Sequence, residues 1–309
     1  MILSIIIVNY NLAKEIENCI NSLLATLANA DGIRYEIIVV DNDSPDRQLP
    51  QIEKQFPQDF IKFIYSETNL GFGKGCNLGF SNSAGSYICF LNPDTIVQEN
   101  IFTPLINLLK ADESVGIIAP QQQVRKPFFD FSAGYSPKIT FEFFNLFGLG
   151  VFLEGMLMHF KVKRKSSPVE VNWILGACIV IRSKLFNSLN GFDEDYFMFS
   201  EEVDLCRRAK NKGFKILYLP HHKIHHIGSV SGKKDYALYT IRSYSSKYIY
   251  INKHFNSLSK GIYKTLLYLQ MFSQIFIWTV LFPFKTQKAK QKLNAFTYLL
   301  KHRFRYNPN

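Results

Sequence analysis

The sequence of 309 residues is poor in cysteine. Its five cysteines are odd in number, scattered, and mostly placed within apolar runs. They therefore predict reduced core thiols in a cytosolic compartment, and they argue against a disulfide framework or a zinc site. The apolar run at the N-terminus has no basic flank and is too short for a signal peptide, so we expect no secretion signal here.

Acidic residues are nearly missing from the last 77 residues. Residues 1–232 hold 22 Lys/Arg and 24 Asp/Glu, whereas residues 233–309 hold 14 Lys/Arg and a single acid, Asp235. The net charge is therefore −2 in the body and +13 in the tail, and the tail carries all of the overall excess of +11. A basic tail on a near-neutral body indicates an anionic partner, either a membrane surface or a nucleic acid.

Short apolar runs alternate with helical patterns in the first 120 residues. Apolar residues recur at helical spacing between the first two runs, and a further helix is expected over residues 98–110. This alternation predicts an α/β fold with a doubly wound, mostly parallel sheet. Buried strands are expected at 3–8, 36–40, 61–64, 87–91, 116–119, within 171–181, and at 215–219, where Pro220 would close the strand.

Asparagine and aspartate follow three of these strands. Turn chemistry explains some of these residues, because Asn and Asp favour turns. In open α/β sheets, however, ligands bind beyond the carboxyl ends of the strands, so three such strand ends favour a common site on one sheet edge. The residues are Asn9, Asn11, Asp41, Asp43, Asn92 and Asp94.

The stretch Gly85–Asp94 joins a buried strand to the turn Asn92-Pro93-Asp94. Pro93 cannot donate to a sheet ladder, so the strand ends there and the two polar side chains sit on a fixed turn. Hard oxygen ligands suit Mg²⁺ or Mn²⁺, which would neutralise a diphosphate. The alternative is that Asn92 and Asp94 only cap the next helix.

Glycine is concentrated at Gly71, Gly73 and Gly75, directly after the third strand. This spacing is not the dinucleotide-binding fingerprint G-x-G-x-x-G. The loop gives a flexible backbone near a helix start that could approach a phosphate, and a merely permissive turn is the alternative.

Three carboxylates, Glu201, Glu202 and Asp204, follow Ser200. Ser200 suits a helix N-cap, and acids in a first helical turn complement the helix dipole. Clustered carboxylates also raise one another's pKa, which suits a general base near neutral pH. Four histidines follow, at 221, 222, 225 and 226, one of which could complete a metal site with Asp94.

Two apolar segments leave open a membrane contact. Residues 139–160 are either a buried helical excursion or an apolar face at a membrane surface. Residues 265–284 carry no charge, and their length permits a membrane span. Polar residues on one face (Gln270, Ser273 and Gln274) favour a helix lying in the interface over a span, and a purely structural packing helix is the third interpretation.

Taken together, these motifs resemble the family-two inverting glycosyltransferases with the GT-A fold, and more narrowly their bacterial rhamnosyltransferase-like branch. The resemblance covers roughly residues 1–232, in the order of the family's motifs. The motifs are Ser4–Asn11, Val40–Ser44, Asn69–Gly73 with Asn77, Phe90–Asp94, Trp173–Cys178, Gly191–Glu194, Phe197–Cys206 and His225.

The resemblance implies roles for these residues. Asp94 and His225 would hold the metal, Mg²⁺ or Mn²⁺, on the donor diphosphate, and Glu202 would be the catalytic base, with Glu201 and Asp204 as rivals. The family usually has Asp at the position of Glu202, so the base lies one methylene further out here. The donor would be bound by Asn9, Tyr10, Asn11, Asp41, Asn42, Asn69, Gly71 and Asn92, and the acceptor by Trp173, Gly176 and Ala177.

The resemblance also implies an organisation and a reaction. Residues 1–120 would form the nucleotide-sugar-binding half, 121–232 the acceptor-binding and catalytic half of the same domain, and 233–309 a basic, helical, membrane-associating extension. The expected reaction moves a sugar from dTDP-rhamnose or a UDP-sugar to a lipid-linked glycan in cell-surface polysaccharide synthesis. We expect peripheral attachment to the anionic cytoplasmic face of the bacterial inner membrane, with a single C-terminal span as the alternative.

Two other functions are weighed against this one. A nucleotidyltransferase also places metal-binding carboxylates after a strand, but it gives no reason for the Glu201–Asp204 cluster. A nucleic-acid-binding protein would explain the basic tail. The aromatic motifs, however, lie in the near-neutral body, so we expect no nucleic-acid partner.

Overall fold

A computed structural model describes residues 2–28, 32–123, 132–164, 168–228, 235–283 and 286–306. The chain divides into two compact units. The first comprises residues 1–135, 158–194 and 202–228, and the second comprises 136–157, 195–201 and 229–309. The basic tail therefore shares its unit with two segments from the middle of the chain, which the predicted boundaries at 120 and 232 do not include.

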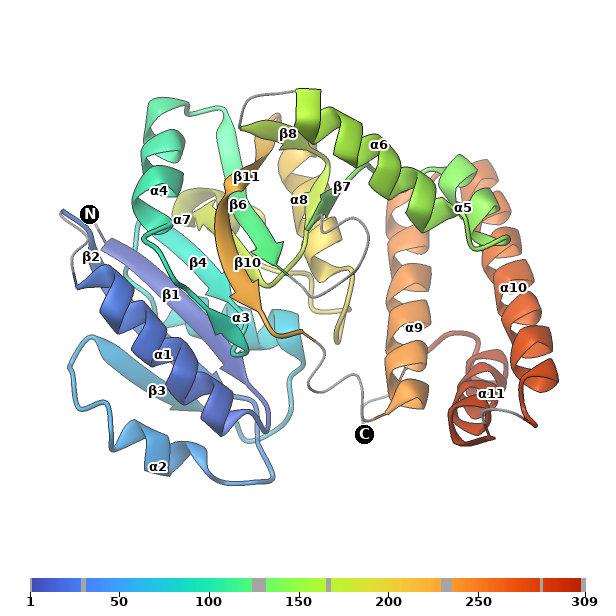
Figure 1. Ribbon diagram of the computed structural model, residues 1–309, viewed down its shortest axis with the longest axis horizontal. Helices are drawn as coiled ribbons and strands as arrows, with labels where there is room; N and C mark the ends of the chain where they lie inside the picture. Colours follow the sequence, from blue (N-terminus) through green and yellow to red (C-terminus); the bar gives the residue numbers. More distant parts are fainter. Residues whose placement is uncertain are drawn as a thin grey trace. The chain divides into compact units, whose positions relative to one another are not determined.

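A nine-stranded mixed sheet forms the centre of the first unit, in the order β3-β2-β1-β4-β10-β6-β11-β5, with β8 also paired to β11. The first four of these strands are parallel, whereas β10 runs antiparallel to both of its neighbours (Figure 1). The strands are β1 Ile2–Asn9, β2 Arg34–Asp41, β3 Ile61–Tyr65, β4 Tyr87–Leu91, β5 Thr95–Ile96, β6 Val115–Gln123, β8 Val169–Val171, β10 Cys178–Arg182 and β11 Lys215–His226. The prediction of an α/β fold with a mostly parallel sheet is confirmed.

Helices cover both faces of this sheet because the strand residues alternate between two cores. Leu3, Ile5 and Ile7 of β1 pack on the side of α1, α2 and α4, whereas Ile6 and Val8 pack on the side of α3, α7 and α8. Nearly all of these side chains are fully buried, which explains the continuous apolar runs of the central strands. The helices are α1 Ala13–Leu27, α2 Leu49–Glu53, α3 Phe72–Ser81, α4 Phe102–Ala111, α7 Ser183–Ser188 and α8 Glu201–Asn211.

The prediction that Pro220 closes a strand is wrong. Strand β11 continues to His226, and its pairing with β6 jumps from Leu219 to Lys223. The strand accommodates the proline in this irregularity, because the residues that skip the ladder need no backbone donor. The continuation carries the two last histidines along β5, with His225 opposite Ile96 and His226 opposite Thr95.

The second unit is helical, with an apolar core of its own. Helix α9 (Tyr236–His254) is capped by Asp235, whose carboxylate accepts hydrogen bonds from two backbone N–H groups. Helices α10 (Ser257–Val280) and α11 (Thr286–Lys301) pack with α9, and α5 (Ile139–Asn145) packs against α10 (Figure 1). Buried core side chains include Tyr263, Leu267, Met271, Phe296 and Leu299. Helix α6 (Gly150–Arg164) begins in this unit and ends in the first.

The uncharged segment 265–284 forms most of α10, and its last residue lies outside the described part of the chain. Within the described ranges, none of the helices combines the length and the apolar character needed to cross a membrane.

Candidate active site

The carboxyl ends of β1 and β2 bring Asn9 and Asp41 side by side, because the two strands pair in parallel with these residues in register. The Asn9 amide donates to Asp41 Oδ1 at 2.8 Å and to Ser44 Oγ at 3.1 Å. Ser44 Oγ in turn donates to Asp41 Oδ1 at 2.6 Å. All three side chains are buried, so they fix the loop after β2 and present no open polar atom at the surface. Ser44, not among the expected site residues, connects this network.

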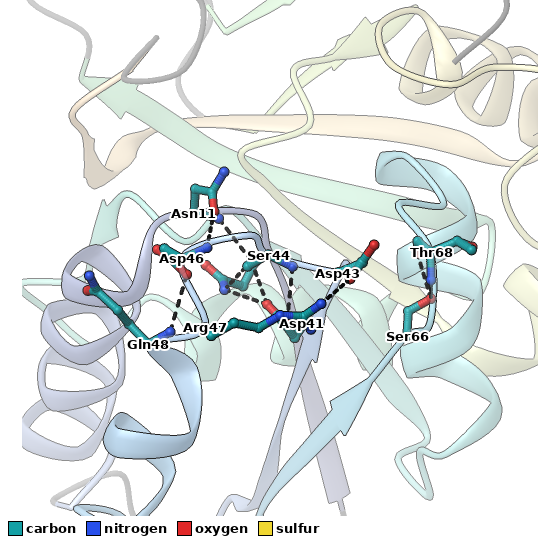
Figure 2. Close-up of polar contacts among 10 residues, drawn as sticks. Asn11, Asp41, Asp43, Ser44, Asp46, Arg47, Gln48, Ser66 and Thr68 are labelled. Carbon is teal, nitrogen blue, oxygen red and sulfur yellow. Dashed lines mark hydrogen bonds and ion pairs between the residues drawn. The ribbon is translucent and has the colours of Figure 1, made fainter. Parts of the chain in front are cut away.

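The hydrogen-bond network of Asn9, Asp41 and Ser44 holds the neighbouring residues that are exposed at this edge of the sheet (Figure 2). The backbone N–H of Asn11 donates to Ser44 Oγ at 2.9 Å, and Asn11 adopts a left-handed backbone with φ of 56°. Its side-chain oxygen accepts a hydrogen bond from the backbone N–H of Asp46. Tyr10 is 40% exposed at the same strand end. Among the predicted donor-binding residues, Tyr10 and Asn11 are the most exposed to a ligand, and the buried Asn9 and Asp41 support them.

Asn42 connects the end of β2 to the glycine loop. Its amide donates to Asn69 Oδ1 at 3.1 Å and to the Gly71 carbonyl at 2.9 Å, and its oxygen accepts from Leu70 N. Gly71 has a φ of 81°, a conformation that favours glycine, and it is the residue preceding α3. The sequence motifs around residues 42 and 69–71 are thus one hydrogen-bonded unit at the edge of the sheet.

Asp94 is paired with His226. Asp94 Oδ1 lies 3.1 Å from His226 Nε2, and Asp94 Oδ2 accepts a hydrogen bond from Gly228 N at 3.1 Å. Asn92 Nδ2 is 3.3 Å from the same His226 nitrogen. The expectation that His225 partners Asp94 is therefore corrected, because the pairing of β11 with β5 brings the next residue, His226, to the carboxylate.

The Asp94–His226 pair fits a divalent metal ion that takes its other ligands from a substrate. Two adjacent ligands of an octahedral ion with bonds of about 2.1 Å stand about 3 Å apart, close to the 3.1 Å seen here. The described residues contain no group of three or more His, Cys, Asp or Glu side chains able to hold a metal alone. Such an ion would need phosphate oxygens and water as further ligands, as is usual for Mg²⁺.

Gly176 and Ala177 lie near Asn92 and Glu202. The Ala177 carbonyl accepts a hydrogen bond from Asn92 N at 2.9 Å. A Cβ atom on Gly176 would lie 4.0 Å from Glu202 Cβ and 3.7 Å from the Phe72 ring, so a small side chain there would touch both residues. Trp173, in β9 (Trp173–Ile174), donates from its indole to the Tyr135 carbonyl at 2.7 Å, next to β7 (Ala133–Gly134), the partner strand of β9.

Glu202 has the properties of a general base. Burial raises its pKa to about 7, against the opposing effect of hydrogen bonds from the backbone N–H groups of Glu202 and Val203. Its Oε2 atom is buried and has no hydrogen-bond partner among the described residues. A carboxylate with a pKa near neutrality and one unengaged oxygen can accept a proton from a substrate hydroxyl.

Asp204, a rival candidate for the base, is engaged in an ion pair. It is fully buried, and its Oδ2 accepts a 2.6 Å hydrogen bond from Arg208 Nε one helical turn away. Arg208 also donates to the carbonyls of Leu189 and Gly191, so the pair ties α8 to the loop before it. The neighbouring Glu201 is buried as well, and it begins α8.

The segment 195–201 leads into Glu202 and is held by the helices of its own unit. Phe197 packs edge-on against Tyr306 at 5.3 Å, and the Arg242 guanidinium lies 4.6 Å from the Phe197 ring. Ser246 Oγ donates to the Met198 carbonyl at 2.7 Å. Phe199 and Ser200 both have positive φ, at 75° and 65°, so Ser200 lacks the extended backbone of the expected N-cap. Consecutive left-handed residues cost about 1–3 kcal/mol each, and surrounding contacts must maintain them.

Comparison with known proteins identifies the family of the chain. The sequence model of "Glycosyl transferase family 2" matches residues 4–185, more than half of the chain, and the protein therefore belongs to that family. It is 28% identical over 261 residues to rhamnosyltransferase WbbL of Escherichia coli, which covers 79% of this chain and 94% of the relative.

A second relative is the N-acetylglucosaminyl-diphospho-decaprenol L-rhamnosyltransferase of Mycobacterium tuberculosis. It is 25% identical over 271 residues, 81% of this chain and 84% of the relative. Among solved structures, the mannosyltransferase PcManGT of Pyrobaculum calidifontis, in complex with GDP-Man and Mn²⁺, superposes with a TM-score of 0.55. The match covers 96% of this chain and 86% of that one at 15% sequence identity, so it bears on the fold alone. The chain is thus a glycosyltransferase with a GT-A-like fold, similar to bacterial rhamnosyltransferases.

Proposed function

We propose that this enzyme transfers a deoxyhexose such as L-rhamnose from a nucleoside-diphosphate donor to a sugar hydroxyl of a lipid-linked acceptor, with inversion. The observation that carries the proposal is the Gly176–Ala177 turn: the Ala177 carbonyl accepts a hydrogen bond from Asn92 N, and a Cβ atom on Gly176 would lie 4.0 Å from Glu202 Cβ. This proximity supports a single site in the first unit that uses both the Asp94–His226 pair and Glu202. The names of the two rhamnosyltransferase relatives support the choice of sugar, and that of the mycobacterial one supports the diphosphate-linked acceptor.

The residues divide the reaction between them. Asn42, Asn69 and Gly71 shape the donor edge, and Tyr10 and Asn11 lie exposed beside it. Asp94 and His226 would hold Mg²⁺ or Mn²⁺, which when bound neutralises charge on the diphosphate leaving group. Glu202 removes the proton of the acceptor hydroxyl as that oxygen attacks the anomeric carbon. A single displacement by the acceptor inverts the anomeric centre, so no covalent intermediate on the protein is needed.

Attachment to the anionic cytoplasmic surface of a bacterial inner membrane is a further part of the proposal. Helix α10 exposes Phe272, Phe276 and Val280 by 53%, 71% and 55%, and α5, which packs on α10, exposes Phe143 and Phe144. The surrounding tail has a net charge of +13. An apolar helix face within a basic region is typical of peripheral binding to anionic lipid.

The experiment that tests the function is a donor and acceptor screen. Purified enzyme is incubated with dTDP-rhamnose or UDP-sugars, a sugar-diphospho-lipid and Mg²⁺ or Mn²⁺, and the nucleotide product is identified. Release of nucleoside diphosphate with glycosylation of the lipid is expected. Release of pyrophosphate would instead identify a nucleotidyltransferase.

A further inference from the structure

Two lysines on one side of α11 meet an aromatic wall in the second unit. The Lys288 ammonium lies 4.6 Å from the centre of the Tyr236 ring and 5.4 Å from that of Trp278. The Lys292 ammonium, one turn further along, lies 5.9 Å from the Tyr239 ring and donates to Thr240 Oγ1 at 2.5 Å. Both lysine side chains are half-buried, unlike Lys290 between them, which is exposed.

No carboxylate balances these two charges in the part of the chain that the structure describes. Three acids of the second unit are engaged elsewhere: Glu142 pairs with Lys247, Asp195 pairs with Lys253, and Asp235 caps α9. Burial, and then the charge of Lys288, lower the pKa of Lys292. A half-buried pair of like charges is unfavourable on its own, and an anion bound between them would remove the cost.

Hydrogen-bond donors remain at this place. An ammonium group has three donors, and Lys292 directs one of them to Thr240. Lys288 has no hydrogen-bond acceptor among the described residues, and the buried indole N–H of Trp278 has none there either. The cluster thus offers two positive charges and several unengaged N–H groups, as an anion with several oxygens requires.

The surroundings of the cluster match the parts of a lipid-linked sugar. The Tyr239 ring contacts Phe199 at 5.1 Å, and Phe199 precedes Glu202 by three residues. In addition, Trp278 belongs to α10, whose exposed residues include Phe276, Ile277 and Val280. The cluster therefore contacts both the segment that leads into Glu202 and the helix that carries an exposed apolar face, which suits a diphosphate that joins a sugar to a lipid.

We propose that Lys288 and Lys292, with the aromatic wall of Tyr236, Tyr239 and Trp278, bind the diphosphate of the lipid-linked acceptor. This inference rests on the proposed function and assigns its acceptor site. The two charges of a diphosphate diester equal those of the two lysines. The donor diphosphate belongs to the separate Asp94–His226 edge of the first unit, so each diphosphate has its own basic or metal-binding partner.

The test compares two double variants that remove the same charge from the same helix. K288Q/K292Q removes the cluster, and K290Q/K301Q removes two exposed lysines. Each is assayed with a sugar-diphospho-lipid of short, water-soluble chain and with the same sugar on an uncharged lipid. We expect K288Q/K292Q to raise the KM for the diphosphate acceptor about 10- to 100-fold, as for the loss of two charge-assisted hydrogen bonds. The KM for the uncharged acceptor, donor hydrolysis and the melting temperature should change little, and K290Q/K301Q should behave as wild type.

Equal effects of the two variants, or an equal loss with the uncharged acceptor, would overturn the proposal. So would a K288Q/K292Q variant that loses binding to anionic vesicles but keeps its KM for the soluble diphosphate acceptor, because the lysines would then bind lipid headgroups. If K288Q/K292Q unfolds, a short-chain lipid diphosphate without sugar is tested on the wild type, where competitive inhibition against the acceptor is expected and non-competitive inhibition would refute the site. Failure of the wild type with every diphosphate acceptor would instead refute the proposed function.

Discussion

Replacing Glu202 by Gln should inactivate the enzyme and stabilise its fold. The carboxyl group has a pKa of about 7 in the folded protein and 4.5 as its ordinary value. Because the folded pKa is raised, folding carries almost no penalty well below pH 4.5, where both states are protonated. The penalty grows as the pH rises and is complete above pH 7, where the folded protein must also hold the buried charge.

The size of this effect follows from the shift. One pKa unit corresponds to about 1.4 kcal/mol, so the penalty is close to zero at pH 4 and on the order of 3 kcal/mol at pH 8. Glutamine cannot ionise, so E202Q should be more stable than wild type by up to about 3 kcal/mol at pH 8 and nearly equal at pH 4. At about 2–4 °C per kcal/mol, the melting temperature should rise by roughly 6–12 °C at pH 8.

The assay pairs melting curves at pH 4 and 8 with initial rates from pH 5.5 to 8.5. The wild-type rate should rise with pH through about 7, as the base loses its proton, and E202Q should lose about two to four orders of magnitude at constant donor affinity. E113Q changes an exposed carboxylate in the loop before β6 and serves as the control. A destabilised E202Q, or one that keeps transfer activity, would refute the assignment, and E201Q would then be tested as the base.

If Asp94 and His226 hold the metal, D94A and H226A should lose divalent-dependent donor binding, whereas H225A should keep it. Isothermal titration with the nucleotide at varied Mn²⁺ measures this binding. Loss of binding in H225A alone would instead assign the metal to His225. Y306A should lower kcat several-fold with little change in the KM for donor, because the segment before Glu202 loses its contact with Phe197; a change confined to the melting temperature would show a structural role only. D204N should destabilise the fold by about 3–5 kcal/mol, since Arg208 loses its buried partner, and unfolding in urea would show it. F272Q/F276Q should release the enzyme from anionic liposomes without affecting donor hydrolysis, and unchanged flotation would remove α10 from the membrane contact.

The sequence predicted correctly that polar side chains gather at the carboxyl ends of the parallel strands. Asn9 and Asp41 each end an apolar run, and parallel pairing must bring such ends together. Their burial was not predictable, because it depends on Ser44 completing the hydrogen-bond network between them. The pairing of Asp204 with Arg208 did have a signal in the sequence, since residues four apart share a helix face.

The choice between His225 and His226 could not be made from the sequence. Side chains alternate along a strand, so the number of residues absorbed by the irregularity at Pro220 decides which histidine reaches Asp94. The sequence also offered no indication that the tail supports the segment before Glu202. Tyr306 and Phe197 are more than 100 residues apart and meet only in the folded unit. From the sequence, deleting residues 257–309 would spare donor hydrolysis. In the structure, that deletion also removes a support of the catalytic segment.

The central claim is that Glu202 drives a single displacement by a lipid-linked acceptor on a nucleotide-sugar donor. The most direct measurement is the anomeric configuration of the product, determined by NMR for wild type and E202Q with the same donor. A single displacement should give an inverted product, with one nucleoside diphosphate released per transfer. E202Q should form product at no more than about 1% of the wild-type rate. A product of retained configuration, or full transfer by E202Q, would contradict it.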